Sequence, residues 1–221
     1  MKNERLSFPQ RARKKKGEGP QRRTEILDAA KRLFVEKGYD ATTIRRIAGN
    51  LGISSTALYV YFTDKNAILG EICDATFEGL IEELDEVRRG SPDPLHALQE
   101  SLEGYIRFGL KHPNEYELVF VSRRSEQFQW PESGDKELGM QAFQRFSGCV
   151  EAAVKAGLTY DTDTDRLAQQ LWAAIHGLVA LLLLKADFCW VDLDSLIRGH
   201  VAMLMRGVTK QGQAKSFLEA Q

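Results

Sequence analysis

The stretch from Thr42 to Lys65 constrains the fold of this chain more than any other part of its sequence. Its first apolar residues recur at positions i, i+3, i+4 and i+7 of one helical face: Ile44, Ile47, Ala48 and Leu51. Thr42 is a candidate N-cap for that helix, Gly52 can adopt the positive φ that often ends one, and Ser54 can cap a second helix. A helix, a short turn with glycine and another helix form a helix-turn-helix, whose second helix enters the DNA major groove.

The predicted second helix carries hydroxyls and phenols on its outer surface in place of charges. Such groups near a helix N-terminus can reach base edges or phosphates. Leu58 and Phe62 lie one turn apart and would hold the opposite face against a core. We therefore expect this helix to read DNA with the following side chains: Ser55, Thr56, Tyr59 and Tyr61.

The residues from Gly52 to Phe62, followed by Asp64, Lys65 and Leu69, resemble the DNA-binding motif of the tetracycline-repressor (TetR) family. The resemblance extends back towards the N-terminus through a set of spaced positions: Thr43, Gly38, Phe34, Ala30, Ile26 and Thr24. Thr56 departs from the pattern, because the family often has glycine or another small residue there. The operator sequence therefore cannot be taken from relatives.

The resemblance implies an all-α protein with a three-helix DNA-binding domain over residues 24–70. It also implies a C-terminal helical domain over residues 71–221 that binds an effector and dimerises. In the family, residues at the start of the first helix of the motif touch phosphate. The expected DNA contacts are Thr42, Thr43, Arg45, Ser54, Ser55, Thr56, Tyr59, Tyr61 and Lys65.

Charge is divided unevenly along the chain. Residues 1–65 hold 15 Lys and Arg against 7 Asp and Glu, whereas residues 66–221 hold 15 against 24. A basic N-terminal part on an acidic body suits a polyanion that binds at one end. Residues 1–23 lack the apolar run of a signal peptide and are predicted to be a disordered basic arm that contacts DNA, with a solubilising tail as the alternative.

Caps and apolar periodicity predict further helices downstream. Their ranges are 65 to about 87, about 95 to 112, 113–120, 136–156, 163–186 and 193–208, with an irregular loop over 122–135. Asp161, Asp163 and Asp165 alternate, but the glycine and distant glutamate of an EF-hand are missing, so acidic residues at a helix start are the simpler explanation.

Cysteine and histidine usage gives no sign of a metal or a cofactor. Cys73, Cys149 and Cys189 are far apart and each lies in an apolar helical pattern, which predicts buried reduced thiols in a cytoplasmic protein. The four histidines are scattered, and neither CxxC nor HExxH spacing occurs. No metal ligand, cofactor or catalytic residue is therefore predicted.

The segment from Leu171 to Leu184 is apolar at nearly every position. Its fourteen residues are too few to span a membrane, and a helix that is apolar on all sides must be buried on all sides. A second copy of the chain is the natural source of the extra cover, as the family resemblance also implies. The expected dimer residues are Leu178, Leu181, Leu182, Leu184, Ile197, Val201 and Leu204.

Aromatic and imidazole side chains on the C-terminal helices mark a candidate ligand pocket, with ordinary core packing as the alternative. They suggest a moderately apolar effector, aromatic or acyl. Trp172, His176 and Gly177 also resemble the Trp-His-Gly signature of one C-terminal subgroup of TetR regulators. The candidate ligand residues are Phe108, His112, Tyr116, Phe120, Trp172 and His176.

These features together predict a cytoplasmic homodimeric repressor that binds operator DNA and is released by a small molecule. The resemblance alone implies that the protein represses transcription and that it binds a ligand. Two alternatives remain open. One is a DNA-binding regulator without an effector, and the other is an enzyme that uses His176 as a base.

Overall fold

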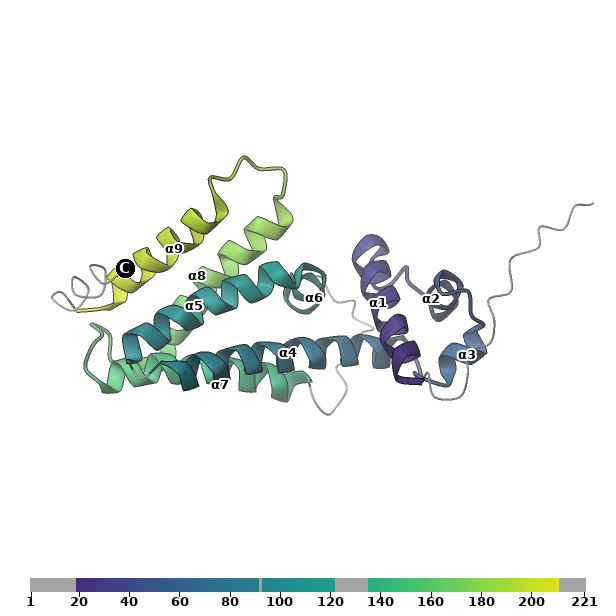
Figure 1. Ribbon diagram of the computed structural model, residues 1–221, viewed down its shortest axis with the longest axis horizontal. Helices are drawn as coiled ribbons and strands as arrows, with labels where there is room; N and C mark the ends of the chain where they lie inside the picture. The colour runs from purple at the N-terminus through teal and green to yellow at the C-terminus, as the bar shows by residue number, and fades with distance from the viewer. Residues whose placement is uncertain (1–18, 92, 122–134, 211–221) are drawn as a thin grey trace, which may run out of the picture. The chain divides into compact units, whose positions relative to one another are not determined.

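The computed structural model describes residues 19–91, 93–121 and 135–210, and within these ranges the chain is almost entirely helical (Figure 1). A single bridge joins Thr159 to Thr209 in that part of the chain. The all-α prediction is confirmed. The helices are α1 (Gly19–Lys37), α2 (Ile44–Asn50), α3 (Ser55–Tyr59), α4 (Lys65–Gly90), α5 (Pro94–Lys111), α6 (Pro113–Tyr116), the π-helical turn η1 (Glu117–Val121), α7 (Asp135–Lys155), α8 (Thr164–Leu184) and α9 (Leu193–Val208).

The described residues form two compact units. The first unit extends to Ile72 and the second begins at Cys73, so α4 starts in one unit and continues into the other. The predicted irregular loop lies almost wholly outside the described residues, as do residues 1–18 of the predicted arm.

Capping side chains fix the ends of the short helices in the first unit. Ser54 Oγ accepts a hydrogen bond from the Ala57 amide at 3.1 Å, and Asp64 Oδ1 accepts one from the Ala67 amide at 2.8 Å. Gly52 has φ +66, as the turn between α2 and α3 requires. The predicted turn at Gly52 and the predicted cap at Ser54 are therefore present.

Thr42 neither caps α2 nor faces solvent, which corrects two predictions. Its side chain is 0% exposed, and Oγ1 donates towards the carbonyls of Leu33 at 3.1 Å and Gly38 at 2.9 Å. These carbonyls belong to the last turn of α1 and its end, where backbone acceptors lack helical partners. Thr43 is the N-cap, since its hydroxyl accepts from the Arg46 amide at 3.2 Å.

Helix α1 begins earlier than predicted. Its first residue is Gly19, before the predicted start of the DNA-binding domain at residue 24, so residues 19–23 are helical and do not belong to a disordered arm. Arg22 forms an ion pair with Glu25 at 2.9 Å within this first part of the helix.

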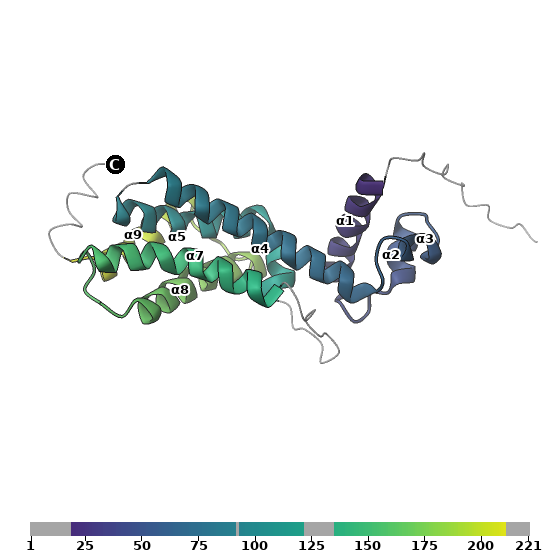
Figure 2. The ribbon, with the colours of Figure 1, turned by 90° about the horizontal axis from the view of Figure 1, so that it is seen from below.

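Helix α5 is central to the second unit, where it contacts α7, α8 and α9. Its buried residues recur along several faces because other helices cover it on several sides. Asp93 caps it by accepting from the His96 amide at 3.0 Å. Figure 2 shows α4 and α7 next to each other in this unit, and their side chains line a common cavity.

Gly109 allows α5 to approach its neighbours closely. A Cβ at this position would lie 2.7 Å from Val179 Cγ1 on α8 and 2.9 Å from Tyr116 Cδ2 on α6. Both neighbouring side chains are buried and stiff, so neither can move away without disturbing the packing.

Replacing Gly109 by alanine is therefore expected to destabilise the protein by about 1–3 kcal/mol, the usual cost of overpacking a core. Gly49→Ala is the matched control, because a Cβ there meets nothing within 4 Å and α2 is not part of the proposed dimer interface. Urea unfolding followed by circular dichroism measures both. Equal stability of the two variants would contradict the close approach.

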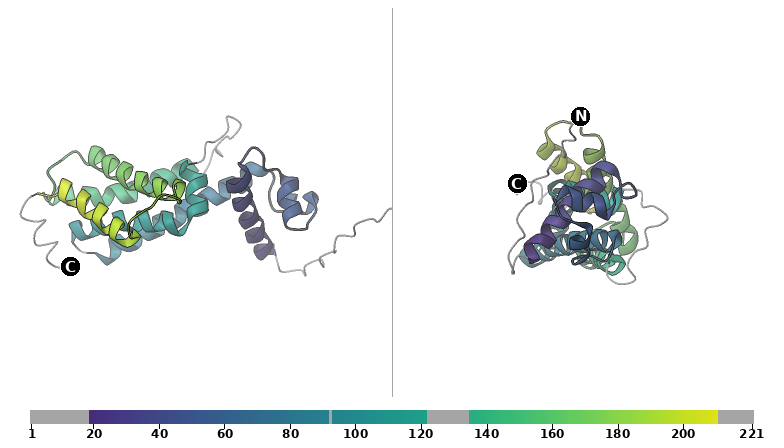
Figure 3. Two further views of the ribbon diagram at one scale, coloured as in Figure 1. Left: turned by 90° about the horizontal axis from the view of Figure 1, so that it is seen from above. Right: turned by 90° about the vertical axis from the view of Figure 1, so that its right-hand side faces the viewer.

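Helices α8 and α9 lie near each other and are joined by residues 185–192 (Figure 3). Helix α9 has the predicted bounds, and Asp163 caps α8 by accepting from the Arg166 amide at 3.1 Å. Cys73 and Cys149 are buried as predicted, but Cys189 is exposed because it lies in the connecting segment rather than in a helix.

Helix α8 has 21 residues, more than the fourteen of its apolar run, and is long and apolar enough to cross a membrane by length and composition. A core helix of a soluble protein can have the same length and apolar composition. One face of α8 packs within the second unit through Leu167, Leu171, Ile175 and Val179, which are all buried.

Candidate DNA interface and effector cavity

Helices α2 and α3 present a surface that contains most of the predicted DNA contacts. Thr43, Arg45 and Thr56 are exposed, and Tyr59 is 55% exposed. Leu58 is fully buried, so α3 turns one face to the core and the other outwards. Val60 is 79% exposed and was missed by the sequence analysis, although an apolar side chain on this surface could contact a thymine methyl group.

Two neighbouring arginines on α2 have different surroundings. Arg46 Nη1 donates to the Ala41 carbonyl at 2.7 Å and thereby supports the turn before α2. Arg45 is exposed on the same helix, which is the arrangement a phosphate contact needs. Arg45, the arginine selected from the sequence, is therefore the better candidate of the two.

Lys65 has a structural role in addition to its predicted DNA contact. Its Nζ donates to the Tyr39 carbonyl at 2.8 Å and lies 3.9 Å from the centroid of the Tyr39 ring. Burial lowers the pKa of Lys65, and burial together with Asp64 and Asp40 raises the pKa of Tyr39 to about 12. A Lys65 variant would therefore disturb the loop after α1 as well as any DNA contact.

Arg23 clamps α1 to the end of the helix-turn-helix, a role that its assignment to the arm had missed. Its Nε donates to Glu71 Oε1 at 2.8 Å, its Nη2 donates to Glu71 Oε2, and its Nη1 donates to the Tyr61 carbonyl at 2.8 Å. The guanidinium also lies 4.3 Å from the centroid of the Phe62 ring. The sequence offered no signal for this clamp, because the partner carboxylate is distant in sequence.

Arg23→Gln is expected to lower the stability of the DNA-binding unit by about 1–2 kcal/mol. A bidentate, partly buried ion pair contributes more to the free energy of unfolding than an exposed pair does. The backbone carbonyl of Tyr61 also loses a charged donor. Arg32→Gln, at an exposed position of α1, is the control. Hydrogen exchange of the α1–α3 amides measures the change, and unchanged protection would argue against the clamp.

A chain of hydrogen bonds crosses the second unit. Trp172 Nε1 donates to Tyr105 Oη at 3.2 Å, and Tyr105 Oη lies 3.2 Å from Tyr116 Oη. Tyr116 Oη is 2.6 Å from His176 Nδ1, while Tyr105 Oη is 3.1 Å from the same nitrogen. Helices α5, α6 and α8 each contribute to this cluster, which we call the Tyr–His–Trp chain.

Every member of the Tyr–His–Trp chain is electrically neutral near pH 7. Burial raises the pKa values of both Tyr105 and Tyr116, so neither phenol ionises. Burial also lowers the pKa of His176, which keeps the imidazole in its neutral form.

An apolar cavity of about 40 Å³ adjoins this chain. That volume exceeds the minimum for a water molecule, but an organic molecule fits only if the lining side chains move. The walls come from α4, α5, η1, α7 and α8: Phe77, Leu80, Leu84, Tyr105, Phe120, Gly139, Ala142, Phe143, Phe146 and Trp172.

The predicted ligand residues divide between three places. Phe120 and Trp172 line the cavity, while Tyr116 and His176 form the far part of the Tyr–His–Trp chain. Phe108 and His112 instead contact each other, with ring centroids 4.7 Å apart, and do not line it.

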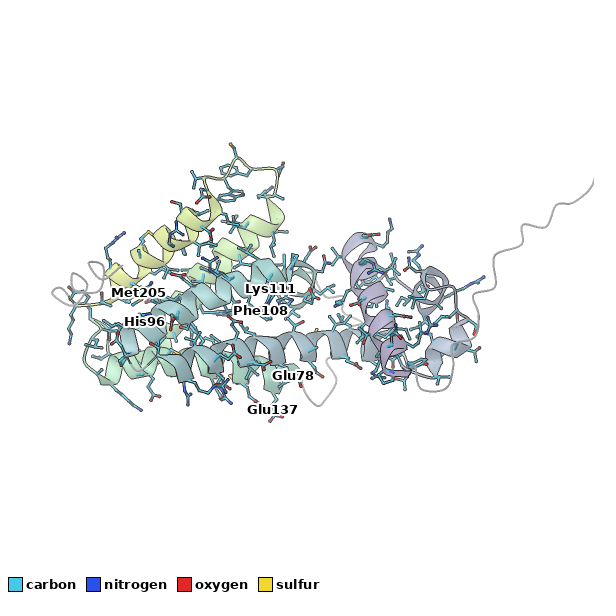
Figure 4. The ribbon with its side chains drawn as sticks, in the orientation of Figure 1. Glu78, His96, Phe108, Lys111, Glu137 and Met205 are labelled. Carbon is cyan, nitrogen blue, oxygen red and sulfur yellow. The ribbon has the colours of Figure 1, made fainter. Side chains whose placement is uncertain are left out.

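Phe108 lies on α5 (Figure 4). A Cβ added to Gly79 of α4 would lie 3.3 Å from its ring. Four of the lining aromatics were not predicted from the sequence: Phe77, Tyr105, Phe143 and Phe146. The i, i+3, i+7 spacing of Tyr105 with Phe108 and His112 was the available signal for one of them.

Two family models match the chain and together cover both units. The model described as "Bacterial regulatory proteins, tetR family" matches residues 26–72, and "Tetracyclin repressor-like, C-terminal domain" matches residues 98–204. This chain belongs to the TetR family. As a TetR-family protein it is a DNA-binding transcriptional regulator, in agreement with the exposed surface of α2 and α3. Its assignment to the Trp-His-Gly subgroup stays a prediction.

Relatives of this TetR-family chain align over most of their length. The transcriptional regulator AcrR of Shigella flexneri is 27% identical over 200 residues, covering 88% of this chain and 92% of that protein. The transcriptional repressor KstR2 of Rhodococcus jostii is 26% identical over 197 residues, covering 81% and 93%. A crystal structure of FadR from Bacillus subtilis in complex with stearoyl-CoA shares the fold, with a TM-score of 0.71, 18% identity and coverage of 83% and 98%.

Members of the TetR family dimerise, and the structure divides the predicted dimer residues of this chain into two sets. Leu178, Ile197 and Val201 are buried within their own chain, so they belong to the core and their assignment to the interface is corrected. They face inwards because α8 and α9 each cover the second unit with one side. Leu181 and Leu184 are exposed, and Leu182 and Leu204 are partly so.

Proposed function

We propose that this TetR-family regulator is a cytoplasmic homodimeric repressor that leaves its operator when a small apolar molecule enters the second unit. The observation that supports a small-molecule effector is the aromatic cavity beside the Tyr–His–Trp chain. Ligand sites are typically apolar with a few placed polar groups, and this cavity has that composition. Phe77, Leu80 and Leu84 line it from α4, the helix that continues from the DNA-binding unit.

The exposed side of α8 and α9 supports self-association. Leu181 is 52% exposed and Leu184 is 56% exposed, one turn apart on α8. Leu193 and Met203 on α9 are exposed as well. We infer that this apolar face packs on the same face of a second copy, because a two-fold axis makes one patch complementary to itself.

The proposed DNA contacts are the exposed residues of α2 and α3 together with the N-terminal basic segment. Tyr59, Thr56 and Val60 would read bases, while Thr43 and Arg45 would contact phosphates. Pairing two such units on one duplex lengthens the recognised sequence, because each recognition helix reaches few base pairs.

Removing residues 1–18 is expected to weaken DNA binding chiefly at low salt, since the deletion removes basic residues and leaves α1 intact. The melting temperature should not change. Fluorescence anisotropy at 50 mM and 200 mM salt measures the slope. Unchanged affinity at 50 mM salt would show that the segment does not contact DNA. The basic residues lost are Lys2, Arg5, Arg11, Arg13, Lys14, Lys15 and Lys16.

The relatives support an apolar effector. FadR of Bacillus subtilis was solved with stearoyl-CoA, and KstR2 is named a repressor. By analogy, we propose that this chain represses and that its effector has a substantial apolar part.

Release of operator by a bound metabolite is the direct test. An operator is first obtained by in vitro selection from a random duplex library. Anisotropy then follows the complex as fractions of a cell extract are added, and native mass spectrometry identifies any retained compound. We expect a fraction that dissociates the complex and adds mass to the dimer.

Binding that no fraction changes, with no added mass, would favour the regulator without an effector. Chemical conversion of a retained compound would instead support the enzyme alternative. His176 hydrogen-bonds to two phenols, Tyr105 and Tyr116, and does not line the cavity, so it is poorly placed to act as a base there.

A further inference from the structure

The cavity wall is almost entirely without polar groups. Only two of the ten lining residues carry a hydrogen-bonding side chain, Tyr105 and Trp172, and none of the ten is charged. The remaining eight are aromatic, aliphatic or glycine. A molecule in this cavity would therefore meet its polar contacts on the side formed by α5 and α8.

The direction of the Tyr–His–Trp chain follows from its two ends. The Trp172 indole nitrogen can only donate, so Tyr105 Oη accepts from it. At the other end, the tautomer of neutral His176 with its proton on Nε2 leaves one lone pair at Nδ1, and the Tyr116 hydroxyl at 2.6 Å is then the closer donor. The Tyr105 proton then points to Tyr116 Oη at 3.2 Å. Protons thus run from Trp172 through both phenols to His176.

This direction makes the cavity end of the chain a source of donors. If the Trp172 N–H turns to a ligand, Tyr105 loses one incoming hydrogen bond but still donates to Tyr116. If the Tyr105 hydroxyl turns instead, Tyr116 keeps its bond to His176. In either rearrangement, the buried polar groups further from the cavity still have hydrogen-bond partners.

We propose that the effector is an uncharged, largely apolar molecule with an acceptor oxygen, such as a ketone, that accepts a hydrogen bond from Trp172 or Tyr105. This inference rests on the proposed function and specifies its ligand. The aromatic wall contacts the apolar body, and the donor end fixes the oxygen.

The cavity disfavours charged ligands. A carboxylate would lie beside two neutral donors with no cation among the lining residues, and an isolated buried ion is strongly disfavoured. An ammonium group would meet donors at the polar end, although aromatic faces could attract it. The effector therefore differs from a free fatty acid in its head group, even where the apolar body is similar.

Four naphthalene compounds that differ in one substituent test the inference: 2-acetylnaphthalene, 2-ethylnaphthalene, 2-naphthoate and 1-(2-naphthyl)ethylamine. A parallel series on an eleven-carbon chain consists of 2-undecanone, undecane, undecanoate and 2-aminoundecane. It tests the same head groups if the naphthalene ring does not fit the cavity. Isothermal titration calorimetry on the full-length dimer gives each Kd.

We expect the ketone to bind about threefold to tenfold tighter than the hydrocarbon, the factor for one neutral hydrogen bond. It should bind more than about tenfold tighter than the carboxylate or the amine. Equal or tighter binding of either charged compound overturns the proposal, and so does failure of every compound to bind at 1 mM (on the order of the weakest specific affinities).

Two conservative variants locate the interaction. Tyr105→Phe and Trp172→Phe each remove one donor and keep an aromatic ring, so each should reduce the preference for the ketone while the hydrocarbon Kd changes by less than about twofold. Tyr160→Phe is the control, at an exposed tyrosine that does not line the cavity. A ketone preference that survives in both variants overturns the assignment of the donors.

Operator binding, measured on the same preparations, distinguishes a failure of the proposed ligand class from a failure of the proposed function. Tight operator binding with no ketone preference contradicts only the ligand class. A wild-type protein that binds no selected operator contradicts the proposed function itself.

Discussion

Replacing Leu181 or Leu184 by glutamate is expected to convert the dimer into a folded monomer whose operator affinity falls by about a hundredfold or more. Both side chains are more than half exposed in the single chain, at 52% and 56%, so its own core does not depend on them. In a dimer they would be enclosed, and an unpaired charge there costs several kcal/mol. The two half-sites are then no longer held by one molecule.

Analytical ultracentrifugation with circular dichroism measures this result. Met140→Glu is the matched control, because Met140 is 57% exposed on α7, a helix that contributes no residue to the proposed interface. It should remain dimeric and bind operator normally. If Leu181→Glu and Leu184→Glu both stay dimeric, the interface is built elsewhere. Unfolding of both would mean that this side of α8 is needed within one chain.

Tyr59→Ala is expected to weaken operator binding by about 1–3 kcal/mol while leaving binding to random DNA nearly unchanged. The phenol is exposed at the end of α3, so its loss removes a base contact without opening the core. Thr56→Ala should have the same pattern with a smaller effect, since it removes only one hydroxyl and a methyl group.

Anisotropy on operator and on a scrambled duplex of equal length measures the discrimination. Thr63→Ala, at an exposed position beyond α3, serves as the control for nonspecific effects. An equal loss on both duplexes would show that Tyr59 contacts the backbone and does not read sequence.

Features that depend on neighbouring residues could be predicted from the sequence. Ser54 and Gly52 act within a few residues of their own position, and the structure has each in its predicted role. The bounds of α9 also follow from local capping and periodicity. Thr42 and Thr43 mark the limit of such signals, because only packing against the end of α1 decides which of them is buried.

Contacts between distant residues could not be predicted in this way. Arg23 resembles the other basic residues near it until Glu71 and the Tyr61 carbonyl are seen beside it. Tyr105 looks like one more core aromatic until Trp172 and His176 join it from α8.

Periodicity also shows which helical faces are apolar without saying what covers them. Leu178 and Leu181 look equivalent in the sequence, yet only Leu178 packs inside its own chain. The assignment of Leu178, Ile197 and Val201 to an interface failed for that reason.

The symmetry of the selected DNA shows whether this regulator binds its operator as a dimer. In vitro selection from a random duplex library, with the wild-type protein, should yield an inverted repeat whose half-sites are about one helical turn apart, or a multiple of it. Sedimentation should then show an even number of chains on each duplex. Enrichment of a single unrepeated site, bound by one chain, would contradict a dimeric regulator that reads DNA through α2 and α3.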